Sequence, residues 1–470
     1  PPPVDPAVAE PISAMLDVAS AEGGVVTEDG KRMFFNWRIT GVSQVWRQDG
    51  PLAYPIQLTG GRGATTIRAL SPDGSFLVVA RDFDGQENPG LYLLAPTGGP
   101  MTKLFHKPGV QAFLDFVSDD GRYIYYRTNE ARRDAFALHR FDRQTGATDA
   151  VLTEPGLWAV QDYRGDEVLL EKTIGNTHNE IWRLNLRDKS MLPVLGQDAT
   201  SEWTVRFGAA AGQYLVLTDH ESEFTRLWAY HAGQPRRRLS PDVRFDVSSF
   251  SIDHLRKRVY YVTNEAGYSR LAMLDAATLR PMRVPALPAH ENAWGGGTTR
   301  NGRFSAFSYD GARSPAATVI HDWRTGKSVA WRTPSLPEVN ADALVAPTLE
   351  TYPARDGTPI PMFVYRPATC AKGDGTPCPV VVHFHGGPES QTRAGFSAFA
   401  QVFARAGFIL VQPNVRGSTG YGKVWLDADN GARRLAVVTD IEDCARYLRT
   451  AWRQGGVAPK LGVYGSSYGG

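Results

Sequence analysis

The chain has 470 residues, with 51 Lys and Arg against 49 Asp and Glu, and 42% of its residues are hydrophobic. This composition is typical of a globular protein with two or three domains. The one dense basic run, Arg236–Arg238, is too short to supply a nucleic-acid surface, so we expect no nucleic-acid partner. No stretch approaches the roughly 18 apolar residues that a membrane span needs, and we expect none.

A turn followed by an alternating apolar strand recurs through the first two thirds of the chain. Ser71–Gly74 precedes Phe76–Val79, for example, and Ser118–Gly121 precedes Tyr123–Tyr126. The turns fall at positions 30, 74, 121, 165, 212, 256 and 302. A period of about 40 to 50 residues that holds four short strands is typical of a β-propeller blade. Two unrelated β-sandwiches would not give so regular a step, so we predict seven blades over residues 23–334.

A different pattern begins near residue 340, after a stretch without clear strand alternation that we interpret as a linker. A hairpin is predicted to turn at Asp356-Gly357. Short apolar strands then alternate with helical spacing, with strands at Val380–Phe384, Phe408–Val411 and Leu461–Tyr464 and helices around Phe396–Phe403 and Val437–Trp452. This alternation predicts a doubly wound, mostly parallel α/β sheet over residues 335–470.

The last predicted strand leads directly into the segment Gly465–Gly469, which fits the pattern G-x-S-x-G with Ser467 at its centre. A serine displayed on a sharp strand-to-helix turn holds strained backbone angles, so small residues are needed two positions before and after it. Another predicted strand ends in the segment His385–Pro388, whose glycines offer bare backbone N–H groups for an oxyanion hole. Together the two motifs predict an acyl-transfer site.

Several charged residues and histidines near these motifs are predicted to be structural. His385 is expected to hold its loop, because in an α/β-hydrolase the catalytic acid and base follow the serine in chain order. Arg416 is expected to anchor its loop through carbonyls or a carboxylate. Asp440 and Asp443 precede Ser467, so they do not fit the triad acid, and we expect them on the solvated face of their helix. No zinc-ligand spacing occurs, so we expect no metal site and no cofactor.

The motifs together resemble those of the prolyl oligopeptidase family of serine peptidases, which join a seven-bladed propeller to an α/β-hydrolase domain. The resemblance rests on His385–Glu389, Pro413–Gly422 and Gly465–Gly470, and it covers nearly the whole chain. It implies that Ser467 is the nucleophile. It also implies an oxyanion hole, formed by the backbone N–H of Tyr468 and one N–H from Gly386 or Gly387.

The same resemblance makes two predictions about the ends of the sequence. An N-terminal segment, residues 1–22, is expected to pack on the hydrolase domain through a helical stripe of Ile12, Met15, Leu16 and Ala19. The triad Asp and His are expected after Gly470, in a C-terminal hydrolase segment that the 470 residues lack. Because Ser467 without a base is a weak nucleophile, we expect the 470 residues alone to be inactive.

The predicted function is that of a serine peptidase that cleaves short peptides through an acyl-enzyme on Ser467, with the propeller gating access. No adjacent Glu-Glu pair occurs in the sequence, which argues against release of dipeptides and leaves oligopeptidase and acylaminoacyl-peptidase activity open. Glu223 and Arg226 are the candidate substrate-binding residues, with a surface salt bridge as the structural alternative. Two other functions stay open: a non-catalytic propeller interaction module with an inactive hydrolase remnant, and an esterase.

The three cysteines give information on the cellular compartment of the protein. Cys370 and Cys378 bracket a polar, Gly-rich loop. A disulfide there would indicate a periplasmic or secreted protein, whereas two free thiols would suit the cytoplasm, and the sequence leaves both open. Cys444 lies in a helical pattern and is expected to be a buried small hydrophobe. The oligomeric state is not fixed by any of these features.

Overall fold

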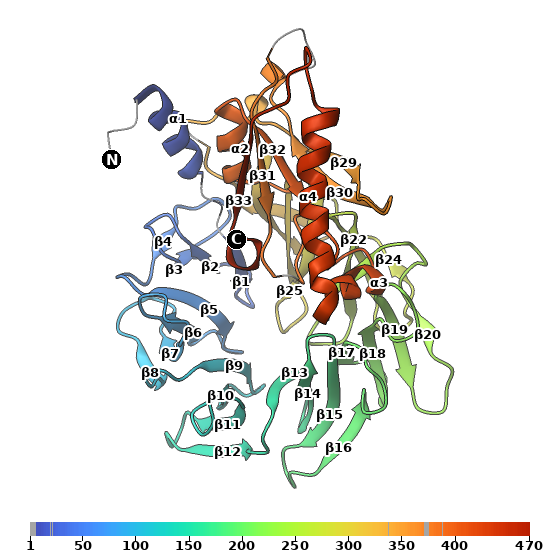
Figure 1. The fold of residues 1–470 in the computed structure, drawn as a ribbon. Helices are drawn as coiled ribbons and strands as arrows, with labels where there is room; N and C mark the ends of the chain where they lie inside the picture. The colour runs from blue at the N-terminus through green and yellow to red at the C-terminus, as the bar shows by residue number, and fades with distance from the viewer. Residues whose placement is uncertain (1–5, 19, 21, 337, 371–375, 388) are drawn as a thin grey trace.

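The computed structural model of the protein describes residues 6–18, 20, 22–336, 338–370, 376–387 and 389–470. A ring of seven four-stranded sheets forms one part of the molecule, and a five-stranded sheet with helices forms the other (Figure 1). No helix in the described ranges is long and apolar enough to cross a membrane.

Each sheet of the ring is an antiparallel meander built from one continuous stretch of chain, so the prediction of a seven-bladed β-propeller is confirmed. The first four blades contain β1 (Glu22–Val26), β2 (Met33–Trp37), β3 (Gln44–Gln48) and β4 (Ile56–Gln57); β5 (Ala64–Leu70), β6 (Leu77–Asp82), β7 (Gly90–Leu94) and β8 (Thr102–Phe105); β9 (Ala112–Val117), β10 (Tyr123–Thr128), β11 (Ala137–Asp142) and β12 (Thr148–Leu152); and β13 (Leu157–Arg164), β14 (Glu167–Gly175), β15 (His178–Asn185) and β16 (Met191–Leu195).

The remaining three blades follow the same order from the inner to the outer strand. They contain β17 (Trp203–Phe207), β18 (Gln213–Thr218), β19 (Arg226–His231) and β20 (Arg237–Arg238); β21 (Asp246–Ile252), β22 (Arg258–Glu265), β23 (Tyr268–Asp275) and β24 (Pro281–Met282); and β25 (Asn292–Thr298), β26 (Phe304–Gly311), β27 (Ser314–Asp322) and β28 (Lys327–Arg332). Apolar clusters between successive blades form the core of the ring.

The repeated turn has a backbone cause that is the same in every blade. Each of the seven predicted positions joins the first strand of a blade to the second, and each has a positive φ. Six are glycines, which adopt this conformation without strain. The seventh is Arg256, with φ 53°. The regular spacing of the turns in the sequence therefore arises from one residue with a left-handed backbone in each blade.

The first and last blades share no strand, and the ring is closed by side chains together with a backbone hydrogen bond of 3.3 Å from the Leu52 N–H to the Trp331 carbonyl. Phe35 and Trp46 of the first blade share an apolar cluster with Trp331 of the last. The Gln48 side chain donates a hydrogen bond of 2.6 Å to the Trp331 carbonyl. We call this junction the seam.

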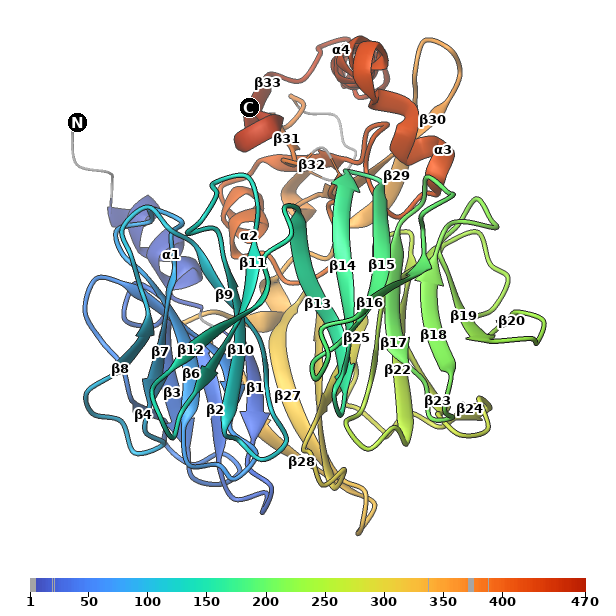
Figure 2. The ribbon, with the colours of Figure 1, turned by 90° about the horizontal axis from the view of Figure 1, so that it is seen from below.

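Polar side chains cross the central channel at the end of the ring that carries the seven repeated turns. Arg300 of the seventh blade forms an ion pair of 2.7 Å with Asp119 of the third. Arg256 of the sixth blade donates a hydrogen bond of 2.9 Å to Asp162 of the fourth. Because neither pair of blades is adjacent in the ring, these contacts span the channel. In the view turned by 90°, the strands of the blades run from top to bottom, and the second part of the molecule lies at their upper end (Figure 2).

The second part of the molecule is a mixed sheet in the order β29-β30-β32-β31-β33. Its strands are β29 (Thr348–Pro353), β30 (Pro359–Tyr365), β31 (Val380–Phe384), β32 (Ile409–Pro413) and β33 (Leu461–Gly465). The sheet is less parallel than predicted: β31 is parallel to β32 and β33, whereas β29, β30 and β32 pair antiparallel. The reason is the hairpin between β29 and β30, whose tight turn at Gly357 forces antiparallel pairing.

Helices cover both faces of this sheet. The long helix α4 (Arg434–Ala451) packs Cys444 and Leu448 against Val380 and Val382, and α2 (Ala398–Arg405) covers the face that carries Val381. Cys444 is buried, as predicted. The shorter helices are α3 (Lys423–Leu426) and the 3-10 turns η1 (Ala341–Ala343), η2 (Ala368–Cys370), η3 (Asp427–Asp429), η4 (Gly431–Arg433) and η5 (Ser467–Gly469).

The N-terminal helix α1 (Pro6–Leu16) packs on α2 in this second part of the molecule. Met15 is fully buried beside Val339 and Leu344, next to α2. The predicted stripe is wrong for Leu16, whose side chain points away from the packed face and is 62% exposed. Ala19, the last predicted member of the stripe, lies outside the described residues.

Candidate active site

Ser467 is held on a strained turn directly after β33. Its φ is 56°, in the left-handed region that residues other than glycine rarely adopt. A Cβ atom at Gly465 would overlap the carbonyl oxygen of Gly469, and one at Gly469 would overlap the carbonyl oxygen of Phe384. The backbone strain and the crowding that the sequence pattern predicts for this turn are therefore both present.

The Gly386-Gly387 turn lies beside this serine. A Cβ built on Gly386 would lie 3.3 Å from Ser467 Cβ and 3.8 Å from Ser467 Oγ, so a side chain at Gly386 would crowd the Ser467 side chain. Gly387 has a φ of 132°, which again favours glycine. The structure thus brings Ser467, Tyr468, Gly386 and Gly387 together. Their roles as nucleophile and oxyanion donors stay predictions.

His385 links two loops of the site. Its Nδ1 lies 2.8 Å from the Gly386 carbonyl, and its Nε2 lies 2.8 Å from Ser418 Oγ. Burial lowers the pKa of His385, which favours the neutral ring. Because a carbonyl can only accept, the single ring proton belongs on Nδ1. The one proton of the Ser418 hydroxyl is then shared between the unprotonated Nε2 and the Val415 carbonyl, which lies 2.7 Å from Oγ. Both nitrogens are occupied, so the geometry agrees with a structural role for His385.

The loop from Pro413 to Gly422 is tied to the segment of Thr392 by a buried amide. Asn414 is fully buried, and its Oδ1 accepts a hydrogen bond of 2.8 Å from the Thr392 N–H. The Asn414 Nδ2 donates to the Thr392 carbonyl at 3.0 Å and to the Tyr421 hydroxyl at 2.9 Å. These bonds use both donors and the oxygen of the Asn414 side chain, so the Pro413–Gly422 loop is fixed relative to the segment of Thr392.

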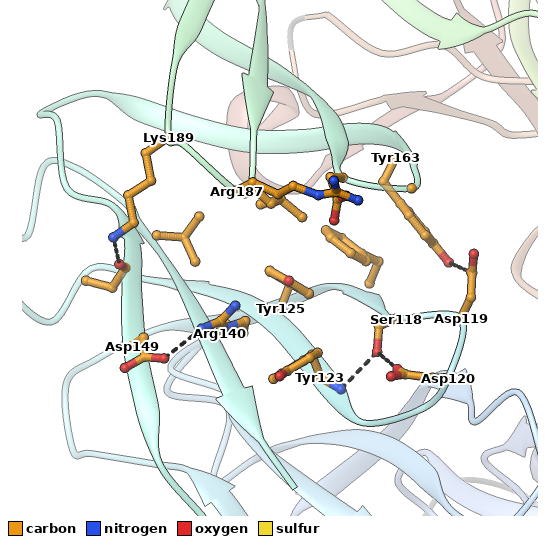
Figure 3. A pocket seen from close by; sticks show the side chains of 16 residues that line it. Ser118, Asp119, Asp120, Tyr123, Tyr125, Arg140, Asp149, Tyr163, Arg187 and Lys189 are labelled. Atoms are coloured by element: carbon orange, nitrogen blue, oxygen red, sulfur yellow. Dashed lines mark hydrogen bonds and ion pairs between the residues drawn. The ribbon is translucent and has the colours of Figure 1, made fainter.

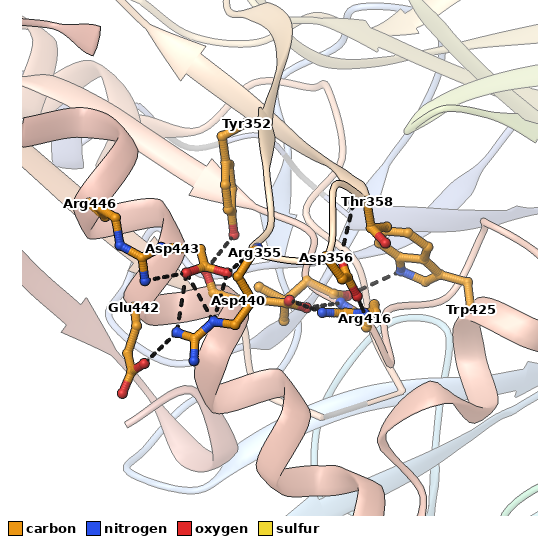
Figure 4. A network of polar contacts seen from close by, with 11 residues as sticks. Tyr352, Arg355, Asp356, Thr358, Arg416, Trp425, Asp440, Glu442, Asp443 and Arg446 are labelled. Atoms are coloured by element: carbon orange, nitrogen blue, oxygen red, sulfur yellow. Dashed lines mark hydrogen bonds and ion pairs between the residues drawn. The ribbon is translucent and has the colours of Figure 1, made fainter. Parts of the chain in front are cut away.

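Arg416 is anchored by two carboxylates beneath the site (Figure 4). Its Nε lies 3.0 Å from Asp440, and its Nη1 lies 2.6 Å from Asp356. Asp443, one turn along α4, accepts a hydrogen bond of 2.6 Å from the Arg355 N–H. The prediction that Asp440 and Asp443 lie on a solvated face is wrong, because they are 0% and 2% exposed. They face the sheet because arginines from neighbouring loops neutralise them there.

These pairs shift the pKa values of their members. The Asp440 and Asp356 carboxylates raise the pKa of Arg416 above its ordinary value. Hydrogen bonds from Thr358 and Arg416 lower the pKa of Asp356 to about 2. Hydrogen bonds from Arg355 lower the pKa of Asp443 against the opposing effect of burial. The lowered pKa values of Asp356 and Asp443 favour their ionised forms, and arginines engage both carboxylates.

Asp429 is a residue of the site that the sequence did not reveal. It is fully buried, and neither of its carboxylate oxygens has a hydrogen-bond partner among the described residues. A Cβ on Gly417 would lie 2.5 Å from its Cγ, so the motif glycine is in direct contact with this carboxylate. Burial raises the pKa of Asp429, which the nearby Arg434 opposes. Nothing in its polar surroundings, Asp427–Asn430, distinguishes it in the sequence.

Glu223 and Arg226 lie where the propeller meets the second sheet. Glu223 Oε1 accepts a hydrogen bond of 2.9 Å from the Val424 N–H, and its carbonyl accepts one of 2.8 Å from Lys423. The Arg226 side chain is 2% exposed and donates to the Phe245 carbonyl at 2.6 Å. Protein groups already engage both side chains, and their predicted role in substrate binding stays a prediction.

A cavity of about 280 Å³ lies at this same junction, lined from the propeller by Glu202 and Asp246 and from the loop side by Arg393 and Lys423. Burial and the neighbouring Asp219 raise the pKa of Glu202 to about 7. The cavity therefore mixes acidic and basic groups between the two parts of the molecule.

A larger cavity of about 960 Å³ lies on the propeller, between the third and fourth blades (Figure 3). Its charged side chains are bound to protein groups: Arg140 to Asp149 at 2.9 Å and Lys189 to the Ala150 carbonyl at 3.2 Å. We assign it no role in the site around Ser467. Among the described residues, no group of three His, Cys, Asp or Glu side chains is placed to hold a metal ion.

The fold and the turn at Ser467 define a class: a seven-bladed propeller joined to a sheet that carries a serine of the nucleophile-elbow type. Comparison with known families narrows this class. The family model described as "Prolyl oligopeptidase family" matches residues 394–470, which contain the loop of Arg416 and the elbow.

Individual relatives agree with this match. The chain is 25% identical to dipeptidyl aminopeptidase BIII of Pseudoxanthomonas mexicana over 278 residues, which is 55% of this chain and 38% of the relative. It is also 25% identical to prolyl oligopeptidase A of Amanita bisporigera over 371 residues, which is 75% of this chain and 46% of the relative. The chain thus spans less than half the length of these curated relatives.

Solved structures show the same fold. A structure from a study of two prolyl endopeptidases matches 99% of this chain and 71% of its own, with a TM-score of 0.83 and 18% identity. Prolyl oligopeptidase B from Galerina marginata matches 98% of this chain and 70% of its own, with a TM-score of 0.79 and 16% identity. The predicted resemblance to the prolyl oligopeptidase family is confirmed.

The elbow glycines provide the first test of the site. We expect Gly465→Ala to destabilise the protein by about 1 to 3 kcal/mol or more, because its methyl group has no space beside Gly469. Gly462→Ala in the same strand is the matched control, since its Cβ would meet Val381 at 3.8 Å. Its effect should stay within about 0.5 kcal/mol. Urea unfolding measures both, and equal effects would show that the elbow is not crowded.

Acid should weaken the anchor of Arg416. Because the pKa of Asp356 is about 2 in the folded protein and has an ordinary value of 3.8, the folded state is stabilised above pH 3.8. This contribution is lost as the pH falls towards 2. The partly exposed pair contributes about 1 kcal/mol or less. We expect Asp356→Asn to remove it, so its free energy of unfolding should fall less steeply with acid. Asp17→Asn, on an exposed residue, should match the parent protein, and an unchanged slope in Asp356→Asn would contradict the assignment.

Proposed function

We propose that the protein is a serine peptidase that cleaves short peptides through an acyl-enzyme on Ser467. The observation that carries the proposal is the strained elbow, which presents Ser467 beside the Gly386 turn. A binding scaffold has no physical need for a left-handed serine between two obligatory glycines. The names of the relatives, prolyl endopeptidase and prolyl oligopeptidase among them, support peptides as the substrate class.

In this mechanism Ser467 Oγ attacks the carbonyl carbon of the scissile peptide bond and gives its proton to a base. The carbonyl oxygen becomes an oxyanion, which the N–H of Tyr468 and an N–H of the Gly386-Gly387 turn stabilise. The C–N bond then breaks, and the base returns the proton to the leaving amine. Water attacks the resulting ester by the same route and releases the acid, which restores Ser467.

The base and its acid are proposed to come from a hydrolase segment that follows Gly470 and completes an α/β-hydrolase domain. In this chemistry both residues follow the serine in the chain, and no described side chain hydrogen-bonds to Ser467 Oγ. A feature of the surface supports this: strand β33 is an edge strand on which Val463 is 71% exposed. The 470 residues alone are expected to be inactive.

Access of substrate is proposed to be from the junction of the two parts rather than through the propeller. The contacts of Arg300 with Asp119 and of Arg256 with Asp162 cross the channel at the far end. The cavity of about 280 Å³ lies at the near end, between Asp246 and Lys423. In this arrangement the propeller acts as a wall that excludes folded proteins.

Ser467 is tested by labelling the full protein, including any segment after Gly470, with a fluorophosphonate. We expect covalent labelling that Ser467→Ala abolishes and Ser190→Ala, on an exposed propeller turn, preserves. Hydrolysis of a fluorogenic peptide should fall by at least about 10⁴-fold in Ser467→Ala. A full protein that takes no label would support the interaction-module alternative. A labelled protein that cleaves esters and no peptide would be an esterase.

The compartment is proposed to be the periplasm or the exterior. The structure joins Cys370 and Cys378 in a disulfide, while Cys444 is a buried free thiol. Disulfides persist in oxidising compartments. Thiol titration of denatured protein taken from its native source, with thiols blocked at lysis, should find one free thiol before reduction and three after it. Three free thiols before reduction would place the protein in the cytoplasm.

A further inference from the structure

Arg332, the last residue of β28, carries a buried charge without a counter-charge. The residue is 8% exposed, and its Nη2 donates a hydrogen bond of 2.7 Å to Thr318 Oγ1. Its Nε and Nη1 have no hydrogen-bond partner among the described residues. Burial is the one cause found for its lowered pKa of about 10, so no carboxylate contributes and the group is still protonated near neutral pH.

An unpaired buried guanidinium is costly. Buried polar groups in proteins are almost always hydrogen-bonded, and buried charges are almost always paired. In the same propeller Arg258, with a side chain 12% exposed, pairs with the buried Asp253 at 3.0 Å. Arg47, Arg140 and Arg226 each leave their Nε without a partner among the described residues, whereas Arg332 leaves both Nε and Nη1. The orphan N–H groups of Arg332 therefore point to a partner that is not part of the chain.

Arg332 lines a cavity of about 180 Å³ at the seam between the first and last blades, and its unpaired Nε and Nη1 are buried within the cavity wall. Arg332 and Trp331 line it from the last blade, and Phe35 and Trp37 line it from the first. The Arg332 guanidinium lies over the Phe35 ring, with Cζ 5.0 Å from the ring centre. The indole N–H of Trp37 is also buried without a partner.

The walls of the cavity thus combine aromatic faces with unpaired donors. The guanidinium of Arg332 brings a positive charge to this wall, and two nitrogens of Arg332 and one of Trp37 are unpaired donors buried within it. Such a set of donors matches an anion, and a guanidinium matches a carboxylate in particular. The aromatic walls match an apolar body attached to it.

We propose that the seam cavity is a binding site for a small carboxylate with an apolar or aromatic body, held by Arg332. A volume of about 180 Å³ is what roughly six water molecules occupy in liquid water, so the ligand is smaller than a drug-sized molecule. A free aromatic acid and the C-terminal residue of a short peptide both present this chemistry. The site is independent of Ser467, because it bridges the first and last blades.

The test uses the full protein and isothermal calorimetry with phenylacetate. We expect saturable binding that is at least tenfold tighter than binding of phenylacetamide, which has the same shape and no charge. Acetate and chloride should also bind at least tenfold more weakly, because they lack the apolar body. Because the ligand bridges the seam, phenylacetate should raise the melting temperature. N-acetylphenylalanine distinguishes the two sources: binding as tight as that of phenylacetate indicates a peptide C-terminus, and weaker binding indicates a free acid.

Variants separate a binding role from a structural one. Arg332→Met keeps the side-chain length and removes the unpaired charge, so we expect a folded protein that has lost phenylacetate binding at least tenfold. Arg238→Met, on the outer strand of the fifth blade, is the matched control and should bind as the parent does. If Arg332→Met does not fold, Ala316→Leu fills the cavity and keeps the arginine, and it should also abolish binding. No saturable binding by the parent protein, or equal binding by Arg332→Met, would overturn the proposal.

Discussion

The left-handed backbone of Ser467 is the constraint on which the rest of the second domain depends. The turn fits because Gly465 and Gly469 leave space for carbonyl oxygens that a methyl group would displace. One of those carbonyls belongs to Phe384, at the end of β31, so the elbow is packed against the start of the Gly386 turn. The position of the glycine turn is therefore fixed by the same close approach that strains the serine. Strain of this kind persists where the surroundings over-determine it.

Those surroundings are mostly polar, and they are well satisfied. Asn414 joins its loop to the segment of Thr392, and Arg416 ties that loop to Asp440 on α4. A buried ion pair contributes little net stability compared with apolar packing, but removing one partner is costly. The main effect of this network is therefore to fix the positions of the loops. It holds the loops in one arrangement, which an apolar core of similar size would specify less strictly. Asp429 is the exception, since its carboxylate is buried without a hydrogen bond from the described residues.

The sequence predicted what depends on local geometry and missed what depends on distant partners. The seven blades were predictable because each carries a left-handed turn at the same step, and even Arg256 keeps the position without being glycine. Its side chain explains the exception, because it bonds to Asp162 across the channel. Asp440 was misjudged for the opposite reason: its pattern is that of a solvated helix face, and its partner Arg416 lies 24 residues earlier. Asp429 had no local signal at all.

Closure of the propeller ring involves both the ion pair that crosses the channel and the unpaired Arg332 at the seam. Because no strand crosses the seam, side chains such as Gln48 and Trp331 help to hold the ring there. At the end with the repeated turns, Arg300 reaches across the channel to Asp119 and restrains the last blade against the third. An unpaired Arg332 at the seam opposes this closure, since its charge is buried without compensation. An anion between Arg332 and Trp37 would remove that cost and join the first and last blades. In the proposed arrangement, the charge of Arg332 therefore couples binding of an anion at the seam to the rigidity of the ring.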